Sequence, residues 1–474
     1  MGVTRELQSL LGPERVTEDA FALRLYSEDA GGLRGSPTVV VFPRTTSEVR
    51  GIVGIAVQHG VPIVARGAGT GLAAGAVPNQ GGIVVSTKLM DTIFEIDPVD
   101  RTAWVGPGVI NLDLSVAAAP HGLHFAPDPS SQAVCTVGGN VANNSGGPHC
   151  LAEGSTVSHV LAVEVVLANG EVLVLGSAAP DSIGLDLRGV VTGSEGTLGI
   201  VTRVLVGLLP DPPDVRTLLL AYDSVEAAAA TVSGVIAAGV VPAALEMMDQ
   251  RMAVAVENWL HAGLPVEAAA LLLAEVVGEP AAVEAEAEVI RRVGAESGAT
   301  SIQTAADEEE RALLWKGRKS AFGAVAQAAP DYYLHDTVVP RTRLVETMGR
   351  VYEIADRYGL IMMNVFHAGD GNLHPLIAYD ASDPDETRRV HQAAEEMVVM
   401  CVEQGGVLSG EHGIGLEKRD LMPMMFTVAD LDAQARLKEC FDPHDVFNPT
   451  KVLPAGSRCF DLGGSRPLPE GTWV

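Results

Sequence analysis

Three segments rich in glycine and small polar residues constrain the fold and function of this chain more than any other feature. They cover residues 65–76 (ARGAGTGLAAGA), 127–147 (PDPSSQAVCTVGGNVANNSGG) and 192–202 (TGSEGTLGIVT). Each offers backbone N–H groups with little side-chain bulk, which suits phosphate binding. Their Asn and Ser side chains add hydrogen-bonding groups for a polar ligand. Three such loops predict a site for a large ligand such as FAD, although composition alone does not separate FAD from another nucleotide.

The first glycine-rich segment also satisfies a dinucleotide-binding pattern, which we reject. Counted from Gly69 it matches GxGxxA, and Asp91 lies at a suitable distance for a ribose hydroxyl. That motif must open a long helix, whereas Gly75 and Pro78 stop a helix almost at once. Taken alone, the segment is explained equally well as an ordinary glycine-rich loop.

The length of the chain predicts more than one domain, because 474 residues exceed what one hydrophobic core usually supports. A composition of 47% hydrophobic and 19% charged residues is typical of a folded globular protein. The prolines of PDPPD, residues 210–214, indicate a boundary. We therefore predict an FAD-binding domain at residues 1–212, a substrate (cap) domain at 213–415 and a C-terminal segment at 416–474 that packs on the FAD-binding domain.

Local patterns predict an α+β fold in both domains. Residues 38–42 and 61–67 are expected to be strands on either side of a helix over residues 45–60, with Thr45 and Glu48 at capping-box spacing. Asn169-Gly170 between two apolar runs predicts a hairpin. After residue 214, strand–helix–strand order occurs twice, which favours a ferredoxin-like antiparallel sheet backed by helices.

The charge of the chain excludes some partners and creates a requirement. Its formal net charge is −28, from 32 basic and 60 acidic residues, so the average surface should repel nucleic acid and anionic lipid. An acidic surface does not attract a carboxylate substrate. Such a substrate would need an arginine or a metal ion within the site.

The cysteines and the N-terminal residues favour a cytoplasmic protein. The cysteines are Cys135, Cys150, Cys401, Cys440 and Cys459. They form no CxxC pair for an iron–sulfur cluster, and their small odd number argues against a disulfide framework. The first residues lack a signal-peptide pattern, and Glu6 does not fit the myristoylation motif. No apolar run reaches the ~18 residues of a membrane span, so we expect membrane contact, at the inner face, only through a partner.

The three loops, in this order and spacing, resemble the FAD domain of the vanillyl-alcohol oxidase superfamily. More narrowly, WKGRKSAFGAV, PDYYLHDTVVPR, NVFHAGDGNLHPL, SGEHGIGLEK and FDPHDVFNPTK resemble the catalytic flavin subunits of bacterial glycolate oxidase, whose relatives act on D-lactate and D-2-hydroxyglutarate. The resemblance covers nearly the whole chain. It implies a p-cresol methylhydroxylase-type (PCMH-type) FAD-binding domain of two subdomains. Since Thr70 stands where members with covalent flavin carry a histidine, it also implies non-covalent FAD.

The resemblance also implies which residues contact FAD. They come from the three loops and from the C-terminal motif. The residues are Arg66, Gly67, Ala68, Gly69, Thr70, Gly71, Pro129, Ser130, Ser131, Thr136, Gly138, Gly139, Asn140, Asn143, Ser145, Gly146, Glu195, Gly196, Ile200, Val201 and Asn448.

The motif NVFHAGDGNLHPLIAYD predicts a hairpin with Asp370 and Gly371 at the centre of its turn. Counting outward, Gly369 should oppose Asn372, Ala368 should oppose Leu373, and His367 should oppose His374. The two imidazoles would then project from the same face and could share a metal ion. Taken alone, two surface histidines in a hairpin are the simpler explanation.

The motif SGEHGIG adds further groups to this site. Its glycines let the backbone present Glu411 and His412 at a turn. Glu411 would complete an open site of two histidines and one carboxylate for zinc or another divalent ion. The family resemblance assigns this ligand role to His367, His374 and Glu411, with zinc, iron or manganese as the metal. It assigns His412 the role of general base, which suits an imidazole that titrates near neutral pH.

The resemblance places the substrate-binding groups at Arg318, Asn372 and His412. Arg318 can bind a carboxylate through a bidentate pair; without the resemblance it would be taken as a helix-surface arginine. Relatives that act on the larger dicarboxylate have a Thr and a Lys where this chain has Phe322 and Leu334. This difference predicts a short substrate.

Together these features predict oxidation of a small 2-hydroxy acid, glycolate first, by hydride transfer from its Cα to flavin N5. The electrons would pass to an iron–sulfur subunit, with a second FAD-type subunit, or to a quinone or cytochrome. D-lactate or D-2-hydroxyglutarate dehydrogenase is the alternative within the same class. A zinc hydrolase would leave the glycine-rich loops without purpose. A non-catalytic flavin scaffold is the remaining alternative.

Overall fold

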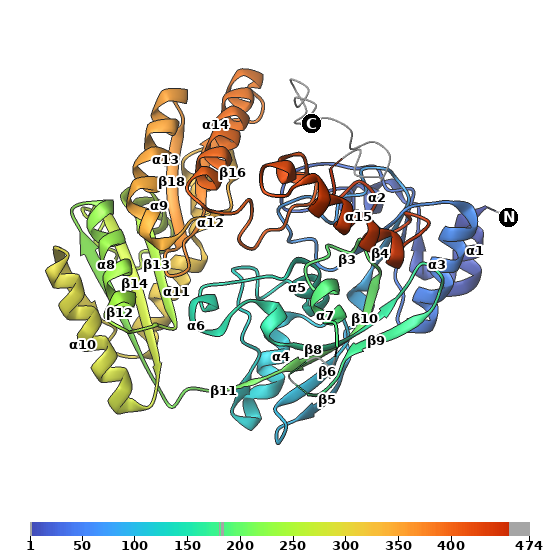
Figure 1. The fold of residues 1–474 in the computed structure, drawn as a ribbon, viewed down its shortest axis with the longest axis horizontal. Helices are drawn as coiled ribbons and strands as arrows, with labels where there is room; N and C mark the ends of the chain where they lie inside the picture. The colour runs from blue at the N-terminus through green and yellow to red at the C-terminus, as the bar shows by residue number, and fades with distance from the viewer. Residues whose placement is uncertain (1, 180, 182–183, 455–474) are drawn as a thin grey trace. The chain divides into compact units, whose positions relative to one another are not determined.

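The computed structural model describes residues 2–454 except 180, 182 and 183. The chain forms two compact units (Figure 1). Unit 1 contains the chain up to Gly146, Ser155–Asp211 and the chain from Glu411 onward, and unit 2 contains Gly147–Gly154 and Pro212–Gly410. Cys459 and the end of the predicted C-terminal segment lie outside the described residues.

Two details of this division differ from the predicted domains. Residues 147–154 belong to unit 2, where His149 Nε2 lies 3.4 Å from Glu275 Oε1. The chain returns to unit 1 at Glu411 rather than at residue 416. The N–H groups of Ile414 and Gly415 donate to Glu195 of unit 1, and this explains the earlier return.

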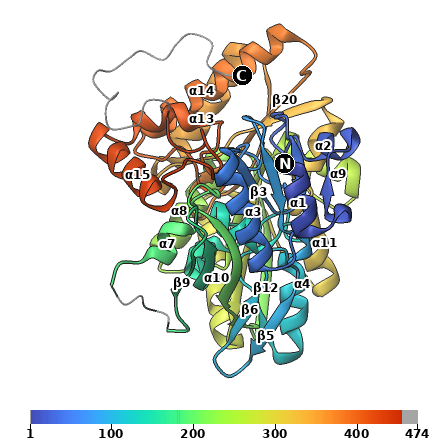
Figure 2. The same ribbon diagram turned by 90° about the vertical axis from the view of Figure 1, so that its right-hand side faces the viewer.

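The N-terminal sheet of unit 1 has the strand order β1-β2-β4-β3. Its strands are β1 (Val16–Thr17), β2 (Val39–Val41), β3 (Ile63–Arg66) and β4 (Ile83–Ser86), and the helices of this part are α1 (Val3–Leu11), α2 (Ala20–Leu25) and α3 (Thr46–His59). The expected strand–helix–strand unit is confirmed by β2, α3 and β3. Thr45 accepts the Glu48 N–H, and Gly60 ends α3 in the left-handed conformation. The strand β4 lies between β2 and β3 and is parallel to both. Helices α1 and α3 lie side by side (Figure 2).

A second, antiparallel sheet of unit 1 has the order β5-β6-β10-β8-β9. Its strands are β5 (Ile93–Asp97), β6 (Thr102–Val105), β8 (Val160–Val166), β9 (Val172–Gly176) and β10 (Ile200–Gly207), while β7 (Leu123–His124) pairs with β11 (Leu209–Pro210). The hairpin predicted at Asn169-Gly170 is confirmed by the pairing of β8 with β9, and Gly170 has a φ of 79°. Helices α4 (Asn111–Ala118), α5 (Val137–Asn143) and α7 (Leu187–Val191) contribute apolar side chains to its core.

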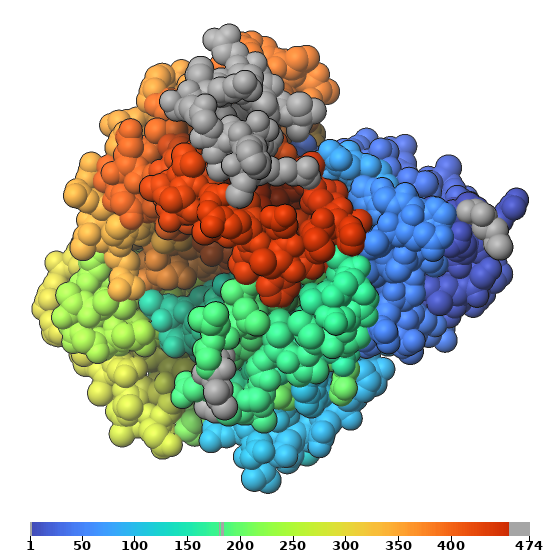
Figure 3. Space-filling view, turned by 45° about the vertical axis from the view of Figure 1, so that its right-hand side comes forward, coloured from blue at the N-terminus to red at the C-terminus, as the bar shows by residue number. Residues whose placement is uncertain are grey.

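The C-terminal part of unit 1 packs back onto the first sheet. The Ile63 N–H donates to the Val446 carbonyl, and the Asn448 N–H donates to the Ile63 carbonyl. Helix α15 (Val428–Phe441) precedes these contacts. Figure 3 shows this segment in red against blue and green parts of the same unit.

Unit 2 is built on one large sheet whose order is β15-β12-β14-β13-β18-β19-β17, with β20 between β18 and β16. The strands are β12 (Asp214–Tyr222), β13 (Ala244–Asp249), β14 (Ala270–Gly278), β15 (Ala299–Thr304), β16 (Asp331–Leu334), β17 (Thr337–Val338), β18 (Ile361–His367), β19 (Asn372–Leu373) and β20 (Pro375–Tyr379). The first of these strands, β12 to β15, have the ferredoxin-like spatial order 4-1-3-2. The predicted α+β cap is therefore confirmed.

Helices cover both faces of this sheet. One face packs on α8 (Val225–Ala237), α10 (Pro280–Glu296), α13 (Leu344–Tyr358) and α14 (Pro384–Glu403), as Figure 1 shows for α8 and α10. On the other side lie α9 (Gln250–Leu260), α11 (Glu308–Lys319) and α12 (Ala321–Ala324); α6 (Cys150–Glu153) contacts β13. Side chains alternate between the faces of a strand. Since Leu245 and Met247 belong to the first core, Glu246 points to the second face.

Candidate active site

The first glycine-rich loop of unit 1 contains no helix between residues 67 and 82, which supports the rejection of the dinucleotide-binding motif. Gly69 has a φ of 77°, and a Cβ there would lie 2.0 Å from the Arg66 guanidinium. A Cβ on Gly67 would lie 2.4 Å from Thr136 Oγ1 of the second loop. The two loops therefore pack closely at Gly67, and the positive φ of Gly69 favours glycine there.

A pocket of about 390 Å³ opens where these two loops meet. Gly67, Ala68 and Thr136, which the sequence predicted as FAD contacts, line it together with Lys88 and Asp91. Thr136 also caps α5 by accepting the Gly139 N–H. The small residues of the pocket wall leave room for an extended nucleotide, so the residues present fit FAD.

Several residues predicted to contact FAD also make hydrogen bonds within the protein through their side chains. The Asn140 amide oxygen accepts from Asn111 Nδ2, and Asn448 Nδ2 donates to the carbonyls of Gly75 and Glu195. Arg66 Nη1 donates to the Glu28 carbonyl. Because these groups already have protein partners, the side chains of Asn140 and Asn448 support the loops.

Two other predicted FAD contacts, Asn143 and Glu195, hold the loop that carries His412. Asn143 Nδ2 donates to the His412 carbonyl at 3.0 Å. The Glu195 carboxylate accepts the N–H groups of Ile414 and Gly415 at 2.7 and 2.8 Å. Burial raises the pKa of Glu195 to about 7. The second and third glycine-rich loops thus position the backbone of SGEHGIG, a role that the sequence did not predict.

Asp29, close to Arg66, makes the stability of unit 1 depend on pH. Burial raises its pKa to about 6, although the Gly31 N–H and the Arg66 charge oppose this shift. Between about pH 4 and pH 6 the unfolded chain loses this proton while the folded chain keeps it. The free energy of unfolding should therefore fall by on the order of 2 kcal/mol as the pH rises through this range.

This prediction is tested by urea unfolding at pH 4 and pH 7. Asp29→Asn, which is neutral at every pH, should lose this component of the pH dependence, and the exposed Asp100→Asn should keep it. An equal pH dependence in wild type and Asp29→Asn would contradict the prediction.

In unit 2, the hairpin between β18 and β20 has a different register from the predicted one. His367 pairs with Asn372, and Asn364 pairs with Pro375, so His367 does not oppose His374 and Gly369 does not oppose Asn372. The turn is longer than two residues. Asp370 Oδ1 accepts the Asn372 N–H, and Gly371 adopts a φ of 80°, so residues 368–371 form a wider loop.

The shift of two residues keeps His367 and His374 on the same face, because the side-chain period of a strand is two. Their ring centroids lie 5.1 Å apart. His367 Nδ1 lies 2.8 Å from Glu246 Oε1, and His374 Nδ1 lies 3.3 Å from the His335 carbonyl. The Glu246 carboxylate and the His335 carbonyl are acceptors, which favours the tautomer with the proton on Nδ1 in each ring. In both histidines Nε2 then has the lone pair that a metal ion requires.

Asp336 connects the hairpin region to SGEHGIG. It is fully buried, and its carboxylate accepts from Ser409 Oγ at 2.5 Å and from the Gly410 N–H at 3.0 Å. Glu411 and His412 are the next two residues along the chain.

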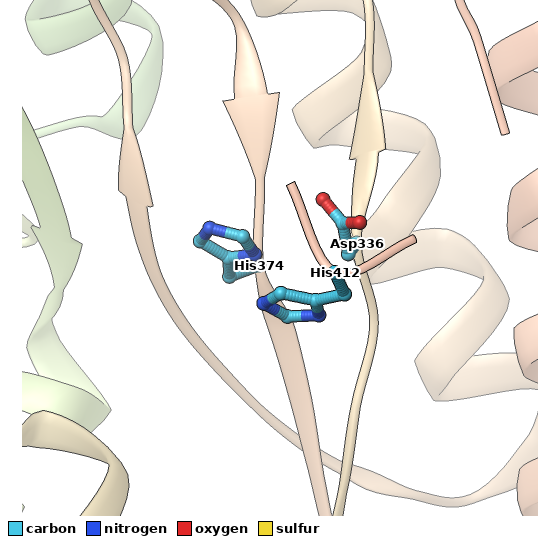
Figure 4. Close-up of side chains that lie close together, drawn as sticks. All are labelled: Asp336, His374 and His412. Carbon is cyan, nitrogen blue, oxygen red and sulfur yellow. The ribbon is translucent and has the colours of Figure 1, made fainter. Parts of the chain in front are cut away.

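Among the described residues, two groups of three side chains have ligand atoms within 4.8 Å of one another. One group is His367, His374 and Glu411, the ligand set that the sequence predicted. The other is Asp336, His374 and His412 (Figure 4). Two imidazole nitrogens and a carboxylate oxygen at such separations fit a divalent ion in either group. Asp336 was not predicted, although it lies in the quoted motif PDYYLHDTVVPR.

Arg318 is buried with 1% exposure, so it is not a helix-surface arginine. Its Nε and Nη2 each lie 2.6 Å from Glu246 Oε2, while Nη1 is buried without a hydrogen-bond partner among the described residues. Asn372 Oδ1 is likewise buried without a partner there. A buried donor and a buried acceptor without partners are costly unless a ligand satisfies them.

Phe322 and Leu334, the two residues that predicted a short substrate, both lie in unit 2. The Phe322 ring lies 6.3 Å from the His374 ring, in an edge-on arrangement. Leu334 is buried on β16. An aromatic ring beside His374 limits the space there, and neither side chain can pair with a second carboxylate.

Comparison with known families covers most of the chain. A model described as "FAD binding domain" matches residues 37–176, and one described as "FAD linked oxidases, C-terminal domain" matches residues 211–452. Among the described residues, no helix is both long and apolar enough to cross a membrane.

Individual relatives agree with this assignment. The glycolate oxidase subunit GlcD of Escherichia coli (strain K12) is 45% identical over 97% of this chain and 93% of its own length. GlcD of Bacillus subtilis (strain 168) is 41% identical over 96% of this chain and 97% of its own length. The D-lactate dehydrogenase of Archaeoglobus fulgidus is 34% identical over 88% of this chain and 91% of its own length.

Solved structures share the fold at low sequence identity. A p-cresol methylhydroxylase with bound substrate has a TM-score of 0.82 and 19% identity, covering 95% of this chain and 96% of its own. The 4-ethylphenol oxidase of Gulosibacter chungangensis has a TM-score of 0.79 and 20% identity, covering 96% and 98%. The expected PCMH-type fold is thus confirmed. The chain belongs to the FAD-linked oxidases and is a flavin-dependent oxidoreductase.

Proposed function

We propose that the protein oxidises a small 2-hydroxy acid to the 2-oxo acid with FAD as electron acceptor. Glycolate is the first candidate and D-lactate the second. The observation that carries the proposal is the buried Arg318 with an unpartnered Nη1, in the same unit as two histidines whose Nε2 atoms can bind a metal. The names of the relatives, glycolate oxidase subunit and D-lactate dehydrogenase, support the substrate class.

We infer that His367, His374 and Glu411 bind the metal, which would be zinc, iron or manganese. The alternative group contains Asp336, whose carboxylate already accepts from Ser409 and Gly410. A carboxylate held this way is better suited to orienting the loop than to binding a metal. His412 then remains available as a base.

In this mechanism Arg318 Nη1 binds the substrate carboxylate, and the Asn372 amide adds a hydrogen bond. His412 removes the proton of the substrate hydroxyl, with its backbone held by Asn143 of the flavin loops. When bound, FAD supplies the hydride acceptor and the divalent ion polarises the substrate oxygens. The buried positive groups meet the need that the net charge of −28 creates.

The substrate is short in this proposal, because Phe322 and Leu334 offer no partner for a second carboxylate. This favours glycolate and D-lactate over D-2-hydroxyglutarate. A zinc hydrolase is disfavoured, since both family models describe FAD proteins.

The electrons would pass to a partner: an iron–sulfur subunit, with a second FAD-type subunit, or a quinone or cytochrome. The word "subunit" in the name of the GlcD relatives supports a multi-subunit enzyme.

Anaerobic mixing of the purified protein with glycolate, D-lactate, L-lactate and D-2-hydroxyglutarate tests the proposal. We expect glycolate to bleach the flavin absorbance. The rate constant of reduction divided by the half-saturating concentration should be higher for glycolate than for the other acids. A yellow protein that none of these acids reduces would refute the function.

The flavin is expected to be non-covalent, because Thr70 has no imidazole to form a flavin bond. Acid precipitation should therefore release all yellow colour into the supernatant as intact FAD, measured by its absorbance and chromatographic mobility. Thr70→Ser should release flavin in the same way. Colour that stays with the precipitated chain would show that the linkage is covalent.

A further inference from the structure

Glu246 joins two functional groups of unit 2. It lies on β13 with 1% exposure. Its carboxylate lies 2.6 Å from both Nε and Nη2 of Arg318, and 2.8 Å and 3.0 Å from Nδ1 of His367. Glu246 and His367 are also direct partners across β13 and β18. One buried carboxylate therefore contacts both the proposed substrate arginine and a proposed metal ligand.

This arrangement has physical consequences for both groups. The Glu246 carboxylate accepts a hydrogen bond from His367 Nδ1–H. This leaves the lone pair of His367 on Nε2, where it can bind a metal. The same carboxylate accepts from Nε and Nη2 of the Arg318 guanidinium, so Nη1 remains for a ligand. Burying Glu246 is favourable only because both partners donate to it. Its position thus couples the orientation of the arginine to that of the histidine.

Helix α11 offers a comparison within the same fold. Glu275, on the neighbouring strand β14 and on the same face, is fully buried. It accepts from Arg311 Nε and Trp315 Nε1 of α11 and from Thr217 Oγ1. Both glutamates therefore hold α11 against the sheet through residues on one side of that helix. Of the two glutamates, Glu246 is the one that contacts Arg318 and His367.

We propose that Glu246 is a positioning residue that sets the geometry of Arg318 and His367 together, so that substrate carboxylate and metal bind as a coupled pair. The proposal rests on the function proposed above. It predicts that neutralising Glu246 weakens metal binding and carboxylate binding at once, whereas neutralising Glu275 lowers stability alone.

The test compares Glu246→Gln with the matched control Glu275→Gln in the full chain with FAD bound. A Gln side chain carries no negative charge and replaces one acceptor oxygen with an NH2 donor, so it weakens the charged pair with Arg318 and leaves fewer acceptor sites for His367. Glu246→Gln is expected to weaken retention of zinc or manganese by about 10- to 100-fold. It should also raise the glycolate concentration for half-maximal flavin reduction by about 10-fold or more. Glu275→Gln should change both quantities by less than about 3-fold while lowering the melting temperature.

The outcomes separate this role from a structural one. Equal effects of the two substitutions on metal and substrate would overturn the proposal, as would unchanged metal retention in Glu246→Gln. Should Glu246→Gln fail to fold, Glu246→Asp and Glu275→Asp provide the same comparison, because each keeps its charge and shortens only its reach. If wild type is not reduced by any 2-hydroxy acid, the proposed function fails, and the ratio of metal retention between the two variants still decides the role of Glu246.

Discussion

His412→Ala is expected to keep FAD and metal and to slow flavin reduction by a 2-hydroxy acid by about 10²- to 10⁴-fold, the usual contribution of a general base. The backbone of its loop is held independently of the imidazole, by Asn143 at the His412 carbonyl and by Glu195 at Ile414 and Gly415. Removing the ring should therefore leave the loop in place. Anaerobic stopped-flow absorbance measures the rate, and elemental analysis measures the metal.

His444→Ala is the matched control for this experiment, since His444 lies on an exposed surface of unit 1 away from these contacts. In His444→Ala, the 2-hydroxy acid should reduce the flavin at the wild-type rate. Loss of metal in His412→Ala would instead assign His412 to the group with Asp336 and His374. Unchanged flavin reduction in His412→Ala would show that another group removes the hydroxyl proton.

His374→Ala and Glu411→Gln are each expected to lose the metal and to lower kcat/KM by about 100-fold or more. A metal ion contributes several kcal/mol by polarising substrate oxygens, and each 1.4 kcal/mol corresponds to about a factor of 10. FAD should stay bound, because neither residue lies in the glycine-rich loops. Metal content after dialysis, flavin absorbance and turnover with glycolate are the measurements.

Asp336→Asn distinguishes the two candidate ligand groups. If Asp336 only holds Ser409 and Gly410, the variant should keep the metal, since an amide oxygen still accepts one of these bonds. Loss of metal in Asp336→Asn together with retention in Glu411→Gln would show that the other group binds the ion. Adding zinc, manganese or iron to chelated wild type identifies the metal that restores activity.

The hairpin of His367 and His374 shows how far local patterns reach. Alternating side chains predicted correctly that both imidazoles share one face, because this depends only on strand periodicity. The register was wrong by two residues. A DG pair is compatible with turns of several lengths, and here the Asp370 carboxylate binds the Asn372 N–H and widens the loop.

Glu246 illustrates a contact that the sequence analysis passed over. An acidic residue within the apolar run AALEMM, residues 243–248, was a signal, since an unpaired charge is rarely buried. Its partners could not be predicted, because Arg318 and His367 lie 72 and 121 residues away along the chain. The roles of Asn143 and Glu195 were missed for the same reason, because they depend on partners more than 200 residues away.

The sequence by itself determined the flavin domain, the α+β cap and the set of chemical groups, because glycine-rich loops, strand periodicity and long motifs are local properties. Only the tertiary structure decided how those groups are paired: Arg318 with Glu246, Ser409 and Gly410 with Asp336, and the His412 loop with Asn143 and Glu195. A buried charge or backbone N–H must find a partner, but which partner it finds depends on packing between distant segments.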